Sequence, residues 1–377
     1  MDVVFAPYVS ERARSNIKQY KYQGCDHSII ANRVLQPFWR WAVEWLPMWM
    51  APNLITLIGF FFIIASYLVT LWYTPSFEGS APGWTYIFHL VCIFVYQTMD
   101  AIDGKQARRT NSSSGLGELF DHGCDAITTF LVLISFLSSI QAGVNGSSLF
   151  NVMFILVAFY FTQWEQYHTG VMELGFIGVT EGHLFMMLGH FITYLFGPSI
   201  WFTTYTLFGY TIQFNAIPLF SSNLTALITI ITNIITVIKS KPKNPIVSVI
   251  QIVPILFVLY VSMTWASNST ALVLQNNPHV YMCTFGFIVA FLVGRIVLAR
   301  ICCDSFFPFQ VIIFPLLVPL LSYSFGINLF SFINESLFIQ LYCIGTIIIY
   351  IHFANVVITA LCKVLQIQCF KLNKKLH

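Results

Sequence analysis

The chain has 377 residues, of which 57% are hydrophobic, 17% aromatic and only 9% charged, and its net charge is +3 at pH 7. Soluble domains carry about 25% charged residues, so this chain has too few charges to cover the surface of a soluble fold. The composition also excludes a disordered chain, a secreted disulfide scaffold and a nucleic-acid binder. It predicts an all-α protein that crosses a membrane many times.

The first 50 residues are expected to lie outside the membrane core, because they are polar and aromatic and include six Lys or Arg residues. Residues 34–50 read VLQPFWRWAVEWLPMWM and combine four Trp with two charges and two Pro. Such a segment favours a helix in the membrane interface over one that crosses the membrane. We therefore predict a cytoplasmic and interfacial segment over residues 1–50.

Ten apolar stretches of about 20 residues follow, each long enough to cross a membrane. They lie at 54–73, 85–103, 119–141, 149–167, 179–196, 221–239, 246–265, 279–300, 308–326 and 336–362. We predict a single membrane domain over residues 51–362, with its catalytic part at about 51–240, and a cytoplasmic tail over residues 363–377.

The positions of the Lys and Arg residues test this count. They precede span 1, lie between spans 2 and 3, 6 and 7, and 8 and 9 (with Arg295 late in span 8), or follow span 10. The loops after spans 1, 3, 5, 7 and 9 contain none. Because basic residues collect on the cytoplasmic side, the pattern predicts an even number of spans with both termini and the loop after span 2 in the cytoplasm.

Five of the fifteen acidic residues fall between positions 100 and 125, where span 2 ends and span 3 begins. Asp100 and Asp103 are three residues apart, and Glu118, Asp121, His122 and Asp125 continue as i, i+3, i+4 and i+7. Each set therefore lies on one helix face. Carboxylates at membrane depth cost several kcal/mol unless they are paired or neutralised, so a functional site is expected here.

Two antiparallel helices joined by a short loop would bring these acidic faces together. The repulsion among the carboxylates calls for cations, and oxygen ligands favour Mg²⁺ or Mn²⁺. Two such ions would suit phosphoryl transfer. Between the acidic faces lie Lys105, Arg108 and Arg109, which can neutralise phosphate, and small residues that allow close approach.

The pattern Asp100-x-x-Asp103-Gly104-x-x-Ala107-Arg108, eight residues, Gly117-x-x-x-Asp121-x-x-x-Asp125 resembles the signature of the CDP-alcohol phosphotransferases. Stretches before and after this motif are similar to the eukaryotic choline/ethanolaminephosphotransferases (aminoalcoholphosphotransferases). They are KYxGxDHS (21–28), LQPFW (35–39), APNLIT (51–56), FLVGRIVLA (291–299), IHFA (351–354) and CF (369–370). Gly115 departs from the family, which usually has Pro at that position.

The resemblance implies an enzyme that transfers phosphoethanolamine or phosphocholine, or both, from the CDP-alcohol to diacylglycerol and releases CMP. It assigns Asp100, Asp103, Asp121 and Asp125 to two Mg²⁺ ions, with Mn²⁺ as a substitute. It assigns substrate binding to Asn53, Gly104, Lys105, Ala107, Arg108, Gly117 and Glu118. It also implies a homodimer in the membrane of the endoplasmic reticulum or Golgi.

A general base is needed because the acceptor hydroxyl has a pKa far above 7. The resemblance points to His122, and Glu118, one turn earlier, is expected to accept its other N–H. Asp125 is the alternative base, although metal ligation would lower its basicity.

Two other functions stay open at this point. One is a family member with a different acceptor such as inositol, although such relatives are usually shorter. The other is an ion or proton transporter, which would more often bind near the membrane midplane and show internal repeats. The preference between choline and ethanolamine is not predicted.

Overall fold

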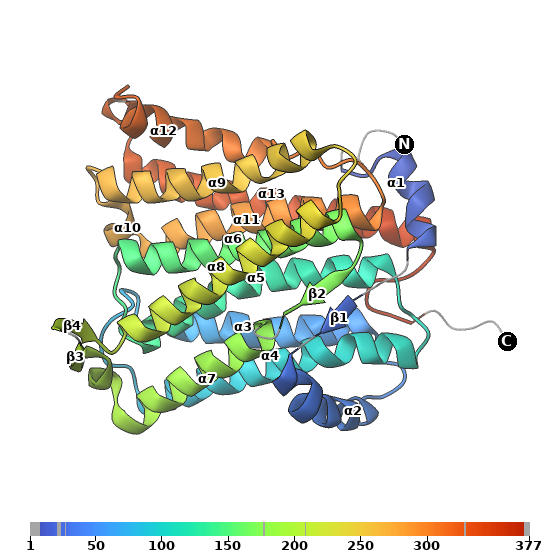
Figure 1. Ribbon diagram of the computed structural model, residues 1–377, viewed down its shortest axis with the longest axis horizontal. Coiled ribbons are helices and arrows are strands. Elements are labelled where there is room, and N and C mark those ends of the chain that lie inside the picture. Colours follow the sequence, from blue (N-terminus) through green and yellow to red (C-terminus); the bar gives the residue numbers. More distant parts are fainter. Residues whose placement is uncertain are drawn as a thin grey trace.

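A computed structural model of the chain describes residues 8–372 except residues 21–23, 27, 176–177, 208 and 328. Most of the described chain is helical, and the long helices pack side by side in one bundle (Figure 1). These long helices are α3 (Pro52–Tyr73), α4 (Gly83–Arg109), α5 (Gly115–Ser139), α6 (Gly146–Thr169), α7 (Val179–Phe196), α8 (Ala216–Lys239), α9 (Pro245–Asn268), α11 (Pro278–Ile301) and α13 (Glu335–Leu365).

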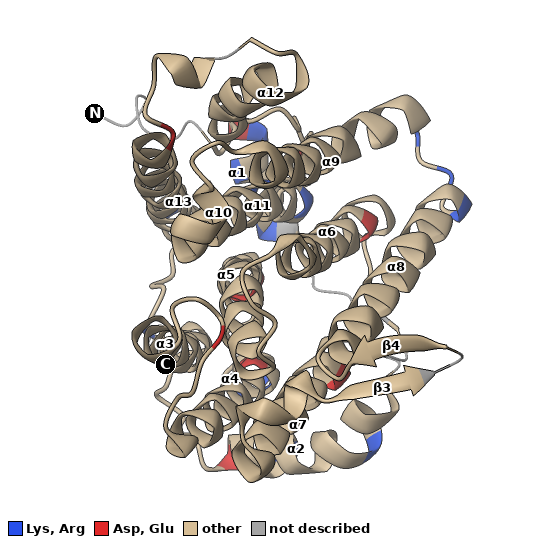
Figure 2. Cartoon of the chain, turned by 90° about the vertical axis from the view of Figure 1, so that its left-hand side faces the viewer, with Lys and Arg blue, Asp and Glu red and all other residues tan. Residues whose placement is uncertain are grey.

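Eight helices of the described chain are long and apolar enough to cross a membrane, which confirms the predicted all-α membrane fold. They are α3, α4, α5, α6, α8, α9, α11 and α13. The long helices are largely free of charged residues, as Figure 2 shows. The most enclosed is α11, which packs against α5, α6 and α13.

The other two predicted spans are helical but differ from the other eight. Helix α7 coincides with predicted span 179–196, but Glu181, His183 and His190 make it less apolar. The stretch predicted to span at 308–326 forms a 3-10 turn, η4 (Val311–Leu316), that continues into the short helix α12 (Leu317–Ser324). At 1.5 Å per residue this unit is shorter than the roughly 30 Å hydrocarbon core. Pro315, which has no N–H to donate, falls inside η4.

The N-terminal segment packs against one end of the bundle. It contains the short helix α1 (Glu11–Asn16), the 3-10 turn η1 (Ile17–Gln19), the π-turn η2 (Ala31–Leu35) and α2 (Gln36–Glu44). Helix α2 packs against α4. Helix α2 buries Trp39 and Val43 and exposes Trp41, and the exposed Trp45 follows its last residue. In Figure 1, α1 lies at the same end of the bundle as the C-terminal end of α13.

The turn between α2 and α3 is fixed by two polar side chains of α4. Arg109 donates from Nη1 to the Val43 and Leu46 carbonyls at 3.0 and 2.8 Å. Gln106 donates to the Pro47 and Met50 carbonyls at 3.0 and 3.2 Å. These bonds tie carbonyls at the end of α2 and in the following turn to α4, and so they help to set where α3 begins.

Two short sheets were not predicted. Strand β1 (Gly24–Asp26) pairs in parallel with β2 (Met172–Leu174), and Gly24 is opposite Met172. The pair joins the N-terminal segment to the connection between α6 and α7. Strands β3 (Thr204–Leu207) and β4 (Tyr210–Gln213) form an antiparallel hairpin. Within the family-like stretch 21–28, residues 21–23 and 27 lie outside the described residues.

The remaining short helices lie between the long ones. They are η3 (Pro198–Phe202), α10 (Val273–Asn276) and η5 (Leu329–Ser331).

Candidate active site

The predicted acidic residues lie on α4 and α5, which are joined by residues 110–114. The connection is short because α5 starts at once: the Ser114 hydroxyl accepts the backbone N–H of Gly117 at 3.2 Å and caps the new helix. The Asp121 carboxylate of α5 interacts with those of Asp100 and Asp103 of α4 and with that of Asp125. The four residues, here called the acidic cluster, are thus brought together as their spacing predicted.

Neighbouring helices supply two hydroxyl donors to the acidic cluster. Thr56 of α3 donates to Oδ2 of Asp103, and Tyr96 of α4 donates to Oδ1 of Asp125. In the described part of the chain, Oδ1 of Asp121 is buried and has no hydrogen-bond partner. A buried carboxylate oxygen without a partner costs free energy of folding. This oxygen of Asp121 is therefore available to bind a cation.

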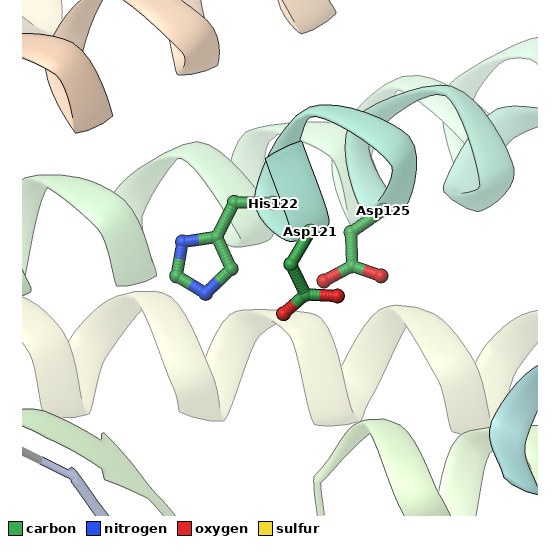
Figure 3. Close-up of side chains that lie close together, drawn as sticks. All are labelled: Asp121, His122 and Asp125. Atoms are coloured by element: carbon green, nitrogen blue, oxygen red, sulfur yellow. The ribbon is translucent and has the colours of Figure 1, made fainter. Parts of the chain in front are cut away.

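The donor atoms at Asp121 fit a divalent metal ion. Asp121, His122 and Asp125 each offer one ligand atom, and these atoms lie within 4.8 Å of one another. In Figure 3 the Asp121 carboxylate lies between the His122 ring and the Asp125 carboxylate. Carboxylate oxygens are the ligands that Mg²⁺ and Mn²⁺ prefer. The geometry adds His122 to the groups that could contact an ion, a role that the sequence did not suggest.

Glu118 bonds to residues of other helices and not to His122, the partner expected from the sequence. Its Oε1 accepts from Arg300, the penultimate residue of α11, and from Gln166 of α6 at 3.3 Å. Both side chains of the Glu118–Arg300 ion pair are only 6% exposed. Arg300 also donates to the hydroxyl of Tyr20 at 3.1 Å. No local spacing links Glu118 to a residue 182 positions away, so the sequence gave no signal for Arg300.

His122 is buried beside Gln163 of α6. Within the described residues, its Nδ1 has no hydrogen-bond partner, and no hydrogen bond joins it to Glu118. The imidazole therefore keeps a free ring nitrogen next to the acidic cluster.

The residues expected to bind the substrate fall into two groups. Asn53, at the start of α3, is buried, and its Oδ1 lies 3.6 Å from the point where a Cβ on Gly117 would be. On α4, the Arg108 guanidinium lies 3.7 Å from the corresponding point on Gly104. Ala107, which directly precedes Arg108 on α4, is half-buried.

Lys105 points toward the N-terminal segment. Its Nζ lies 5.8 Å from the centre of the Trp39 ring on α2, a cation–π contact.

Other polar residues near this end of the bundle serve helix packing. Trp164 and His168 of α6 bond to Ser248 (3.2 Å) and Gln251 (2.8 Å) of α9. Glu181 accepts from the Ser28 hydroxyl and from the Gly178 N–H. His183 is the exception, because the centre of its ring lies 5.9 Å from that of Tyr96. Tyr96 is the residue that donates a hydrogen bond to Asp125.

The comparison with known proteins agrees with this geometry. Residues 49–275, which run from before α3 to α10 and contain the whole acidic cluster, match the CDP-alcohol phosphatidyltransferase family. The chain belongs to this family.

Similar proteins cover nearly the whole chain. The chain is 47% identical to CDP-alcohol phosphatidyltransferase class-I family protein 1 of Dictyostelium discoideum, with 98% of this chain and 96% of the relative aligned. It is 34% identical to choline/ethanolaminephosphotransferase 2 of Arabidopsis thaliana over 98% of this chain and 99% of the relative. It is also 34% identical to cholinephosphotransferase 1 of Saccharomyces cerevisiae, over 90% of both.

The CDP-alcohol phosphatidyltransferase family places the chain among the transferases of phospholipid biosynthesis. It is a multi-pass membrane enzyme with a CDP-alcohol donor and a lipid acceptor. The transporter interpretation is thereby excluded, since the acidic cluster is part of the family's matched region.

Proposed function

We propose that the enzyme transfers phosphoethanolamine, phosphocholine or both from the CDP-alcohol to the hydroxyl of diacylglycerol. The products are phosphatidylethanolamine or phosphatidylcholine, and CMP. The proposal is supported by similarity to choline/ethanolaminephosphotransferases along almost the entire chain. The observation that carries it is the convergence of four aspartates from α4 and α5 around an unpartnered carboxylate oxygen.

In this reaction a bond forms between the acceptor oxygen and the phosphorus that bears the aminoalcohol. The bond from that phosphorus to the bridging oxygen breaks, and its electron pair leaves with CMP. His122 takes the hydroxyl proton, and its buried free nitrogen supports this role. Asp125 is the alternative base, but it already accepts from Tyr96.

The acidic cluster would hold two Mg²⁺ ions, or Mn²⁺ in their place, through Asp100, Asp103, Asp121 and Asp125. A divalent cation bound there neutralises the negative charge that develops on the diphosphate and on the departing CMP. Asn53, Gly104, Ala107, Arg108 and Gly117 bind the nucleotide, and Lys105 assists at the phosphates. Glu118 contributes to this site through its pairing with Arg300.

The purified enzyme tests the proposal with diacylglycerol and either CDP-choline or CDP-ethanolamine, with CMP and phospholipid both measured. We expect transfer that stops in EDTA and returns with Mg²⁺ or Mn²⁺, and the two rates give the headgroup preference. Inositol in place of diacylglycerol should yield no product, and a product with inositol would favour the other acceptor class.

Asp121→Asn should lower turnover by about 10²-fold or more, because a buried oxygen facing the cluster loses its charge. Glu78→Gln is the control: Glu78 is an exposed carboxylate in the connection between α3 and α4 and should be neutral. Full turnover in Asp121→Asn would reject the site.

We also propose that the enzyme forms a homodimer and resides in the endoplasmic reticulum or Golgi. A mass measurement in detergent tests the homodimer, and microscopy tests the location.

A further inference from the structure

The chain turns back on itself after α13. Gln366 adopts a left-handed conformation (φ 55°, ψ 41°), and both its N–H and that of Ile367 bond to the Cys362 carbonyl. This arrangement ends the helix sharply, in the manner of a left-handed C-cap. Residues 367–370 are thereby directed to the ends of α3 and α5 rather than away from the bundle.

Cys369 contacts a residue of the proposed nucleotide site. Its Sγ accepts a hydrogen bond from Nδ2 of Asn53 at 3.5 Å. Burial raises the pKa of the Cys369 thiol, so at neutral pH the sulfur is uncharged and accepts the amide proton as a weak acceptor. Since Oδ1 of Asn53 faces Gly117, the bond to Cys369 fixes which way the amide points.

Phe370 makes the second contact. Its ring meets that of Phe120 on α5 edge to face, with centroids 5.5 Å apart and an interplanar angle of 82°. Phe120 directly precedes Asp121 of the acidic cluster. Phe370 still keeps 42% of its surface exposed, so an aromatic face is available beside the site. Cys369 and Phe370 thus connect the two helices that supply Asn53 and Asp121.

We propose that Cys369 and Phe370 complete the donor site: Cys369 orients Asn53, and Phe370 provides a surface against which the cytosine base packs. This inference rests on the proposed function, because it assigns these residues to the cytidine half of the CDP-alcohol. Base–aromatic packing tolerates any aminoalcohol, so the segment serves both headgroups equally.

Steady-state kinetics test the assignment. Phe370→Ala should raise KM for the CDP-alcohol at least about fivefold, with kcat and the KM for diacylglycerol unchanged. Cys369→Ala should also raise the donor KM, and Cys369→Ser, which keeps an acceptor, should restore much of it. The matched control is Phe332→Ala, since Phe332 is 89% exposed in the connection between α12 and α13. An unchanged donor KM in Phe370→Ala, or a parallel change in all three constants, would overturn the proposal.

A second measurement does not depend on turnover. Maleimide labelling of Cys369, followed by peptide mass spectrometry, should slow in excess CMP. Labelling of exposed Cys303, next to the end of α11, should not change. An unchanged Cys369 rate would contradict the assignment. If no transfer from CDP-choline or CDP-ethanolamine is found, the proposed function fails, and CMP protection alone then decides whether this segment borders a nucleotide site.

Discussion

The Glu118–Arg300 ion pair is buried, and its burial determines how much each residue contributes to the stability of the enzyme. Glu118 Oε2 and Arg300 Nε have no hydrogen-bond partner within the described chain, so the pair is only partly satisfied. A buried pair of this kind adds little net stability, but removal of one partner leaves an uncompensated charge that costs about 3–5 kcal/mol.

Arg300→Met should therefore lower the free energy of unfolding by about 3–5 kcal/mol, because Glu118 remains charged without its partner. The double variant Glu118→Gln with Arg300→Met removes both charges and should recover most of that loss. Thermal unfolding in detergent measures both. If Glu118 also acts in catalysis, activity stays low in the double variant although stability returns.

The control for this cycle is Arg33→Met, which removes an exposed arginine and should change stability by no more than about 0.5 kcal/mol. Additive losses in the double variant would show that the two residues do not stabilise each other.

The sequence predicted the acidic cluster because its spacing is local. Asp100 with Asp103, and Asp121 with Asp125, share helix faces by periodicity alone. The partners of these side chains were not predictable in this way. Thr56 bonds to Asp103 and Tyr96 to Asp125, each from a different helix than its partner. Gln166 and Arg300 reach the neighbouring Glu118 in the same way, and only the packing of α3, α4, α6 and α11 against α5 makes these contacts.

At the scale of elements, the first residue of α5 packs tightly against neighbouring segments. A Cβ on Gly115, the first residue of α5, would lie 2.5 Å from Cγ2 of Ile301 and 3.1 Å from Cδ1 of Ile17. Those residues belong to the end of α11 and to η1. The absence of a side chain at Gly115 thus lets α11 and the N-terminal segment close over the helix that carries Asp121.

Gly115→Ala should destabilise the enzyme by about 1–3 kcal/mol through overpacking, measured as a lower melting temperature. Gly146→Ala is the matched control, since Gly146 is the first residue of α6 and a Cβ there would meet nothing within 4 Å. Trimming of the neighbour, in Gly115→Ala with Ile301→Ala, should relieve the overlap. Equal melting temperatures for the two glycine variants would contradict this account.

The helices themselves were predictable wherever an apolar run was long. Exceptions occur where proline or long-range pairing intervenes. Pro315 helps to convert the expected ninth span into η4 and α12, and the β1–β2 pair joins residues about 150 positions apart, beyond any local pattern.

At the scale of the whole molecule, the Asn-x-Ser/Thr motifs at Asn111, Asn145, Asn268 and Asn334 can accept N-linked sugar, and so they report on the orientation of the bundle in its membrane. Asn145 and Asn334 cap the starts of α6 and α13, and Asn268 ends α9. All three are exposed, and charge placement predicts them on the side away from the cytoplasm. Asn111, also exposed, lies in the connection between α4 and α5 that borders the acidic cluster.

We expect expression in microsomes to give a product that endoglycosidase shortens, and Asn334→Gln should remove most of the shift. Asn145 and Asn268 are weaker acceptors, because Nδ2, the atom that takes the sugar, donates in each to a backbone carbonyl, that of Ala142 at 2.7 Å and that of Thr264 at 2.8 Å. Asn111→Gln should change nothing, since a cytoplasmic loop never meets the glycosylation machinery. A glycan on Asn111 would reverse the orientation and place the nucleotide site on the side that lacks CDP-alcohols.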